Sequence, residues 1–137
     1  MNETPAERER DVRTIVADKE RNVRQALAAL SAQGLGMQVV GEADCALSLQ
    51  REVRLRHADL VIVAWDLVAA SPVTSLAALR DASAGLRVVV LGLRPEARDD
   101  ALAAGADGYI SMVDAPDVVA RVLQSCTEHR NRPGGLS

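Results

Sequence analysis

The chain has 137 residues, a length that suits one domain with a single hydrophobic core. Its net charge of −3 argues against a broad nucleic-acid-binding surface, because phosphate backbones attract strongly basic faces. Phe is absent and Trp and Tyr occur once each, so the core is expected to be aliphatic. No run of about 20 apolar residues and no signal peptide are recognisable, which predicts a cytoplasmic protein without membrane contact.

The first third of the chain predicts a polar arm, a strand, a helix and a second strand. Residues 1–11 are polar and charged and are expected to form a flexible N-terminal arm. Strands are predicted over residues 12–17 and 37–40. The intervening helix is indicated by apolar residues that recur with helical spacing, namely Val23, Ala26, Leu27 and Leu30. Gly34 fits just beyond the end of this helix.

The middle of the chain predicts two further helices around a buried strand. Asp44 is expected to cap a helix that runs to about His57, and its inward residues would be Ala46, Leu49 and Val53. Residues 60–63 are continuously apolar, which is typical of a parallel strand buried on both faces. Ser71 and Pro72 are a suitable start for the next helix, and Gly85 is a plausible end.

The last third continues the alternation. Strands are predicted over residues 86–91 and 108–110, with a short helix over 96–104 between them. A final helix begins near Pro116, and residues 130–137 are expected to form a flexible tail. Two cysteines lack metal-ligand spacing and are interpreted as buried thiols: Cys45 and Cys126.

Five strand-then-helix units predict an α/β fold with a doubly wound parallel sheet. Ligands of such sheets bind beyond the carboxyl ends of the strands, where the strand order reverses. The residues expected at this edge are Asp18, Lys19, Ala64, Trp65, Asp66, Gly92, Ser111 and Met112.

Four segments together carry a likeness to a known family. They are Thr14-Ile-Val-Ala-Asp18, Val39-Val-Gly-Glu-Ala43, Ala58-Asp-Leu-Val61 and Ala103-Ala-Gly-Ala-Asp-Gly-Tyr-Ile110. From about residue 12 to residue 126 the chain resembles a response-regulator receiver domain of two-component signalling. The resemblance implies a flavodoxin-like fold with strand order 2-1-3-4-5. It also implies a single domain over residues 12–129, with no output domain.

The resemblance implies a phosphorylation pocket that this sequence has altered. A receiver carries an acidic pair, a phosphoacceptor aspartate, a hydroxyl residue and a lysine, which act together with Mg²⁺. Here the positions are occupied by Asp18 and Lys19, Ala64, Gly92 and Met112, so only Asp18 is retained. These losses predict an atypical pseudo-receiver that signals without phosphorylation and is not an enzyme. Mg²⁺ is not expected, because hard divalent cations need several oxygen ligands, and no other cofactor is predicted.

Several pocket residues allow two interpretations. Lys19 is either an internal cation that bridges Asp18 and Asp66 or an exposed residue at a helix start. Asp66 is either a substitute phosphoacceptor or an ordinary cap or surface charge. The small and apolar replacements either open the pocket to a small apolar molecule or let Trp65, Met112 and Val68 collapse into it.

A module of this kind would act through a protein partner in signalling or transcriptional control. In receivers the usual partner and dimer face corresponds here to residues 96–104, Tyr109 and residues 117–125. Arg98, Leu102 and Arg121 lie in these segments. The resemblance therefore predicts a homodimer through this face or through the first and last helices. Tyr109 matches an aromatic switch residue, and it is either a packing residue or a switch that Gly92 allows to stay inward.

Overall fold

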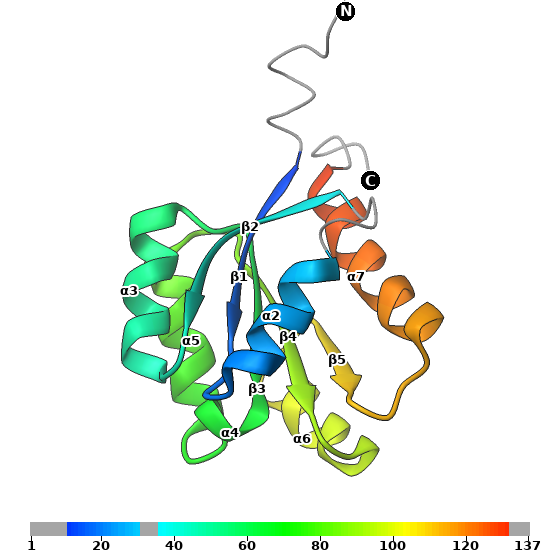
Figure 1. The fold of residues 1–137 in the computed structure, drawn as a ribbon. Coiled ribbons are helices and arrows are strands. Elements are labelled where there is room, and N and C mark those ends of the chain that lie inside the picture. The colour runs from blue at the N-terminus through cyan, green and yellow to red at the C-terminus, as the bar shows by residue number, and fades with distance from the viewer. Residues whose placement is uncertain (1–10, 31–35, 132–137) are drawn as a thin grey trace, which may run out of the picture.

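The computed structural model describes residues 11–30 and 36–131. Residues 1–10 of the predicted arm (1–11), the expected helix end at Gly34 and residues 132–137 of the predicted tail (130–137) lie outside the described residues. The strands are β1 Val12–Ala17, β2 Met37–Ala43, β3 Leu60–Ala64, β4 Arg87–Gly92 and β5 Gly108–Ser111. The helices are α2 Arg21–Ala29, α3 Ala46–Arg56, α4 Trp65–Val68, α5 Pro72–Ala82, the 3₁₀ turn η2 Pro95–Ala97, α6 Arg98–Ala103 and α7 Pro116–Asn131 (Figure 1).

The five strands form one parallel sheet in the order β2-β1-β3-β4-β5, as the resemblance to receiver domains implied. The central strand β3 pairs with β1 from Leu60, which lies opposite Thr14, and with β4 through Leu60 and Arg87. The β1–β2 register shifts between Thr14 and Ile15. The reversal of strand order between β1 and β3 places the carboxyl ends of β1, β3 and β4 side by side, which is where a ligand site is expected in this architecture.

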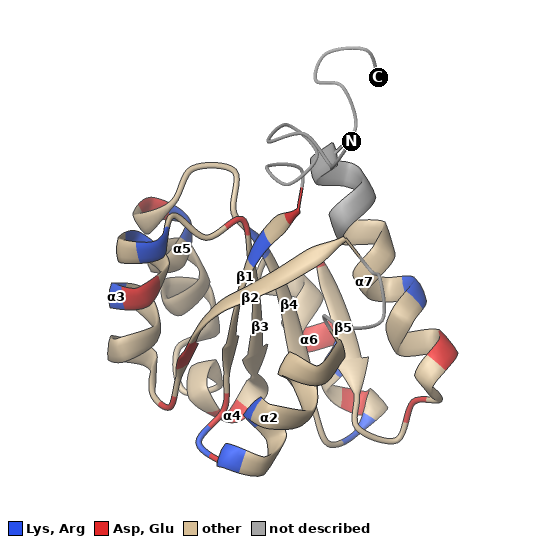
Figure 2. Ribbon diagram, turned by 45° about the horizontal axis from the view of Figure 1, so that its top comes forward, with Lys and Arg blue, Asp and Glu red and all other residues tan. Residues whose placement is uncertain are grey.

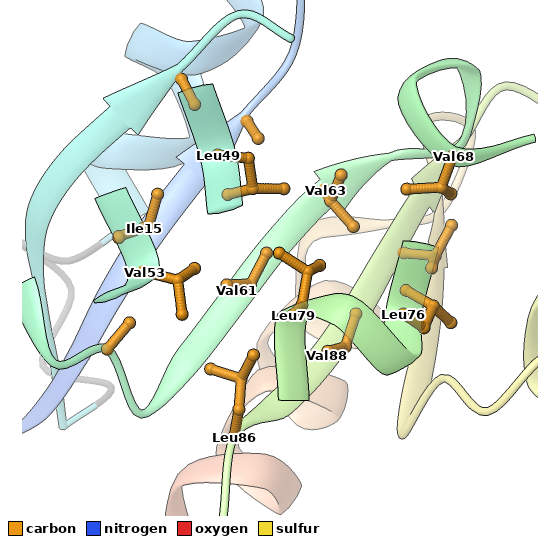
Figure 3. Packing of buried hydrophobic residues seen from close by; sticks show 14 of the residues in the cluster. Ile15, Leu49, Val53, Val61, Val63, Val68, Leu76, Leu79, Leu86 and Val88 are labelled. Atoms are coloured by element: carbon orange, nitrogen blue, oxygen red, sulfur yellow. The ribbon is translucent and has the colours of Figure 1, made fainter. Parts of the chain in front are cut away.

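Helices cover both faces of the sheet (Figure 1). All five residues of β3 are buried, and their side chains alternate between two cores. Val61 and Val63 pack with residues of α3 and α5, including Leu49, Val53, Leu76 and Leu79 (Figure 3). Leu60 and Ile62 pack with Leu27 of α2 and Leu123 of α7. The core is almost entirely aliphatic, as the composition required.

The start of α3 differs from the prediction. Cys45, not Asp44, is the N-cap residue, and its Sγ accepts the backbone N–H of Ser48 at 3.5 Å. Asp44 instead accepts a hydrogen bond from the Ser48 hydroxyl at 3.4 Å. Cys45 and Ala46 are therefore exposed rather than buried, because they precede the turn that faces the sheet. Leu49 and Val53 face inward as predicted, and Cys126 is buried as predicted.

Three further boundaries were not predicted. β2 extends to Ala43, because residues 41–43 continue to pair with Ile15, Val16 and Ala17. Trp65–Val68 forms the short helix α4 directly after β3, between the predicted strand and the predicted helix start at Ser71. α7 reaches Asn131, two residues into the predicted tail, since the helix meets no glycine or proline before Pro133. Among the described residues, no helix is long and apolar enough to cross a membrane.

Candidate functional site at the carboxyl ends of the strands

A cavity of about 630 Å³ opens where β1, β3, β4 and β5 end. All six residues predicted to form the pocket line it, namely Asp18, Lys19, Ala64, Asp66, Gly92 and Met112. Trp65 and Leu91 also line it, as do residues of α2, η2 and α6 that the sequence did not single out. The cavity is therefore broader than the predicted phosphorylation pocket, because η2 and α6 add a second wall.

Asp18 directly follows β1 and is 8% exposed. Its Oδ1 accepts the backbone N–H of Glu20 at 2.8 Å, which turns the chain from the strand into α2. Its own N–H donates to the carbonyl of Ala43 at 3.1 Å. No cationic side chain of a described residue forms an ion pair with this carboxylate. The pocket thus contains a largely buried negative charge that backbone groups alone stabilise within the described chain.

Lys19 does not bridge Asp18 and Asp66. It is exposed, and within the described ranges it forms no ion pair. The hydrogen bond between Asp18 and Glu20 N–H explains this, because the tight turn that it closes leaves Lys19 at the tip of the connection. The internal-cation interpretation of Lys19 is therefore wrong for this structure, and the exposed interpretation holds.

Arg24, rather than Lys19, is the cation held at the end of β1, although it contacts the Asp18 main chain and not its carboxylate. Its Nη1 donates to the carbonyl oxygen of Asp18 at 2.8 Å, and its Nε pairs with Glu42 Oε1 at 2.9 Å. The side chain is only 17% exposed. Arg24 thus ties α2 to the ends of β1 and β2 beside the cavity. Sequence alone gave no signal for this pairing, because Glu42 comes close only through the β1–β2 register.

Ala64 and Asp66 lie on opposite sides of the β3–α4 junction. Ala64 is 7% exposed and is the N-cap residue of α4. Asp66 lies in the first turn of α4 rather than in a loop, and it is exposed. The end of the central strand therefore presents a buried methyl group to the cavity, while the nearest following carboxylate lies at its rim.

Gly92 and Tyr109 are in direct contact. A Cβ atom built on Gly92 would lie 1.9 Å from Tyr109 Oη and 2.7 Å from Cζ. Tyr109 is 6% exposed, and its hydroxyl donates to the carbonyl of Arg94. Burial, followed by the charges of Asp114 and Glu96, raises the pKa of Tyr109. Tyr109 therefore points inward and occupies the space that any side chain at position 92 would need.

Of the two interpretations of the altered pocket, the collapse of Trp65, Met112 and Val68 into it is not what the structure has. Met112 is 49% exposed, because it follows the last residue of β5. Val68 is buried in the core on the α3–α5 face of the sheet, and Trp65 is only partly buried against the same cluster. Ser111 is buried and its hydroxyl donates to the Leu93 carbonyl at 3.4 Å, so it belongs to the loop framework and not to the cavity lining.

The predicted interaction face divides into exposed and buried parts. Arg98 and Leu102 on α6 and Arg121 on α7 are exposed, whereas Tyr109 is buried in the core cluster that also holds Ala101 of α6. Arg121 pairs with Asp117 one helical turn away at 3.6 Å. Both signs of charge occur on α3 and on α7, so neither helix presents a uniformly basic face (Figure 2).

The parallel sheet of order 2-1-3-4-5, with its cavity at the β1–β3 switch point, defines a receiver fold. Solved structures with this fold include a LuxR-family two-component response regulator from Aurantimonas sp. (22% identity, TM-score 0.74), which aligns over 87% of this chain and 86% of its own. The response regulatory domain of protein mrkE from Klebsiella pneumoniae has 17% identity and a TM-score of 0.74, with coverage of 88% and 99%. The response regulator domain of Thermotoga maritima CheB has 19% identity and a TM-score of 0.69, with coverage of 89% and 97%. No protein-family model and no curated protein sequence matches significantly.

Proposed function

We propose that the chain is an atypical receiver, a pseudo-receiver that serves two-component or related signalling without being phosphorylated and without enzymatic activity. The observation that carries this proposal is Ala64, whose methyl group ends the central strand at the cavity floor. Phosphoryl transfer needs an attacking oxygen and surrounding positive charge for the transition state. Ala64 supplies no oxygen, and Gly92 and Met112 supply neither a hydroxyl nor an ammonium group.

The Gly92–Tyr109 contact supports the same proposal. A serine or threonine at position 92 would place its Cβ 1.9 Å from the Tyr109 hydroxyl, so the inward Tyr109 and a hydroxyl residue exclude each other. Within the proposal, Tyr109 holds the domain in one state, and the output does not depend on a phosphoryl signal.

Incubation with acetyl phosphate and Mg²⁺, followed by intact-mass analysis, tests the proposal. We expect an unchanged mass for the wild type. A phosphoryl adduct that disappears in Asp66→Asn would overturn the proposal and would establish Asp66 as a substitute phosphoacceptor. Asp81→Asn is the matched control, because Asp81 is an exposed aspartate on α5 that does not line the cavity.

The output of such a module would be contact with a protein partner or with a second copy. Three exposed apolar side chains support this proposal, namely Leu93, Val113 and Leu102, which are 68%, 72% and 37% exposed. All three lie in or beside η2, α6 and the β5–α7 loop. We propose this side of the domain, together with Arg98 and Arg121, as the partner and homodimer face. Light scattering at high concentration is expected to give a dimer mass that Leu102→Asp reduces to the monomer mass, whereas Leu55→Asp on α3 leaves it unchanged.

The open cavity favours a second candidate function, the sensing of a small molecule. Its volume of about 630 Å³ falls within the range of roughly 300–1,000 Å³ that is usual for ligand sites. Thermal-shift screening tests this candidate, and a series of chemically diverse compounds that all fail to stabilise the protein would remove it.

A further inference from the structure

The cavity combines an apolar floor with an acidic rim. Ala64, Leu91 and Gly92 are buried strand-end residues and form the floor. Five carboxylates line the cavity, namely Asp18, Glu20, Asp66, Glu96 and Asp100, against two cations, Lys19 and Arg94. The lining therefore carries a formal charge of −3. This excess of negative charge disfavours an anionic occupant and attracts a cationic one.

Among the described residues, none of these five carboxylates forms an ion pair. Four acids elsewhere do, because Glu42, Glu52, Asp107 and Asp117 are paired with arginines. The unpaired acids come from five separate elements or their ends, at β1, α2, α4, η2 and α6. Other acids of the described chain, such as Asp44 and Asp81, are unpaired as well, but five unpaired carboxylates come together only in the lining of this cavity among the described residues.

Asp18 is the most informative member of the set. Its Oδ1 is used by the Glu20 N–H, while Oδ2 has no hydrogen-bond partner among the described residues. In the described chain, every fully buried side-chain nitrogen or oxygen has a hydrogen-bond partner. Oδ2 is therefore not sealed inside protein, and because Asp18 lines the cavity, this oxygen opens onto it. Asp18 is 8% exposed and no cation of a described residue pairs with it, so a cation bound at this oxygen would supply a counter-charge that the described chain does not.

The arrangement of the acids separates an organic cation from a metal ion. A hard divalent metal gathers several oxygen ligands around one point. No three acidic, histidine or cysteine side chains of the described residues are placed to do so. A molecule with a cationic head and an apolar stem instead uses both properties of the cavity. Its head would reach Asp18, its stem would cover Ala64 and Leu91, and the Trp65 ring could add a cation–π contact.

We infer that the cavity binds an organic cation, an alkylammonium or alkylguanidinium group on an apolar stem, with Asp18 as its principal counter-ion. This inference names the ligand class of the second candidate function above and rests on it, and it is independent of phosphorylation. The same chemistry is available from a free small amine and from a Lys or Arg side chain of a partner protein.

Trp65 is the only tryptophan and lines the cavity, so its fluorescence reports occupancy. The probes are 1-hexylamine, 1-hexanol and hexanoate, which share a stem and differ in charge, with MgCl₂ titrated alone. We expect saturable binding of hexylamine, and binding of hexanol and hexanoate that is weaker by about tenfold or more, since a charge-assisted hydrogen bond contributes on that scale. Asp18→Asn is expected to weaken hexylamine binding by a similar factor, whereas Asp81→Asn leaves it unchanged.

Other results would overturn the inference in distinguishable ways. Equal binding of hexanol would remove the cation requirement but leave a small-molecule site. If none of the three compounds binds, both the organic-cation inference and the small-molecule site are removed. Saturable binding of Mg²⁺ in competition with hexylamine would identify a metal site instead. If Asp18→Asn does not fold, the double variant Asp66→Asn/Asp100→Asn tests the same charge requirement at two exposed lining positions. A lysine-containing peptide compared with its acetyl-lysine form distinguishes a partner side chain from a free amine as the source.

Discussion

Replacement of Gly92 by alanine should destabilise the domain through one contact. The new Cβ would lie 1.9 Å from Tyr109 Oη and 3.0 Å from Cε1, so the ring must move by more than a small adjustment. Movement breaks the hydrogen bond to the Arg94 carbonyl, a loss of about 1 kcal/mol, and overpacking adds about 1–3 kcal/mol. Gly92 does not have a positive φ, so alanine also gains about 0.5 kcal/mol from the unfolded state. The net loss should be about 2 kcal/mol.

Urea denaturation measures this loss, and a double-mutant cycle assigns it. In a Tyr109→Leu background the obstructing hydroxyl is absent, so Gly92→Ala should cost nothing or stabilise slightly. Gly85→Ala is a matched control, because a Cβ at Gly85 meets no atom within 4 Å and its cost comes only from a φ of +78°. That cost should be the same in both Tyr109 backgrounds. A Gly92→Ala protein as stable as the wild type would refute the proposed contact.

The single tyrosine supplies an independent readout of the same contact. Burial raises the pKa of Tyr109 above its ordinary value of 10.0. The neutral phenol therefore contributes stability that is complete below pH 10 and is lost as the pH rises from there through the folded-state pKa. In Gly92→Ala the displaced ring should ionise closer to its ordinary pKa in an ultraviolet titration. An unchanged titration curve would mean that the ring has not moved.

Three other outcomes follow from the structure. Arg24→Met should lower the free energy of unfolding, measured in urea, by about 1–2 kcal/mol, because the Arg24 side chain is 17% exposed and binds two partners. Arg121→Met should lower it by less than about 0.5 kcal/mol, because the ion pair between Arg121 and Asp117 is exposed. Lys19→Ala should leave the melting temperature unchanged, and a clear decrease would restore the internal-cation interpretation. Iodoacetamide should modify Cys45, which is exposed and whose pKa is lowered by hydrogen bonds from Ser48, before Cys126, whose pKa is raised by burial. Mass spectrometry measures the rate of modification at each cysteine, and equal rates at Cys45 and Cys126 would contradict this prediction.

The parallel sheet was predictable because β3 and β4 are short, continuous apolar runs with helical patterns between them, whereas the strand order followed only from the family resemblance. The cavity residues were predictable for a related reason, since Asp18, Ala64 and Gly92 each end or follow a predicted strand. Alternation of strand and helix is enough to bring such residues to one edge of a parallel sheet.

The orientation of individual side chains was not predictable in the same way. Lys19 and Arg24 are both cations near Asp18 in sequence, and only the Asp18–Glu20 turn and the β1–β2 register decide that Arg24 lies beside the strand ends while Lys19 is exposed. Cys45 was misplaced for a local reason. A thiol as N-cap competes with the more usual Asp44, and the choice depends on which side chain meets the Ser48 N–H.

The acidic character of the cavity also depended on tertiary structure. Glu96 and Asp100 follow β4 in an ordinary charged segment, and no sequence pattern relates them to Asp18. They line the same cavity only because η2 and α6 pack at the carboxyl end of the sheet. The prediction of an apolar ligand therefore came from the floor residues alone, whereas the structure adds the charge of the wall.

The central claim, a receiver fold that works without phosphorylation, is tested most directly by backbone amide spectra of the ¹⁵N-labelled protein. Spectra are recorded before and after addition of Mg²⁺ with the phosphoryl mimic beryllium trifluoride. We predict no shift for the amides of Ala64, Gly92 and Tyr109, because no carboxylate at the end of β3 can accept the mimic and Tyr109 is already inward. Saturable shifts at these three positions would contradict the account.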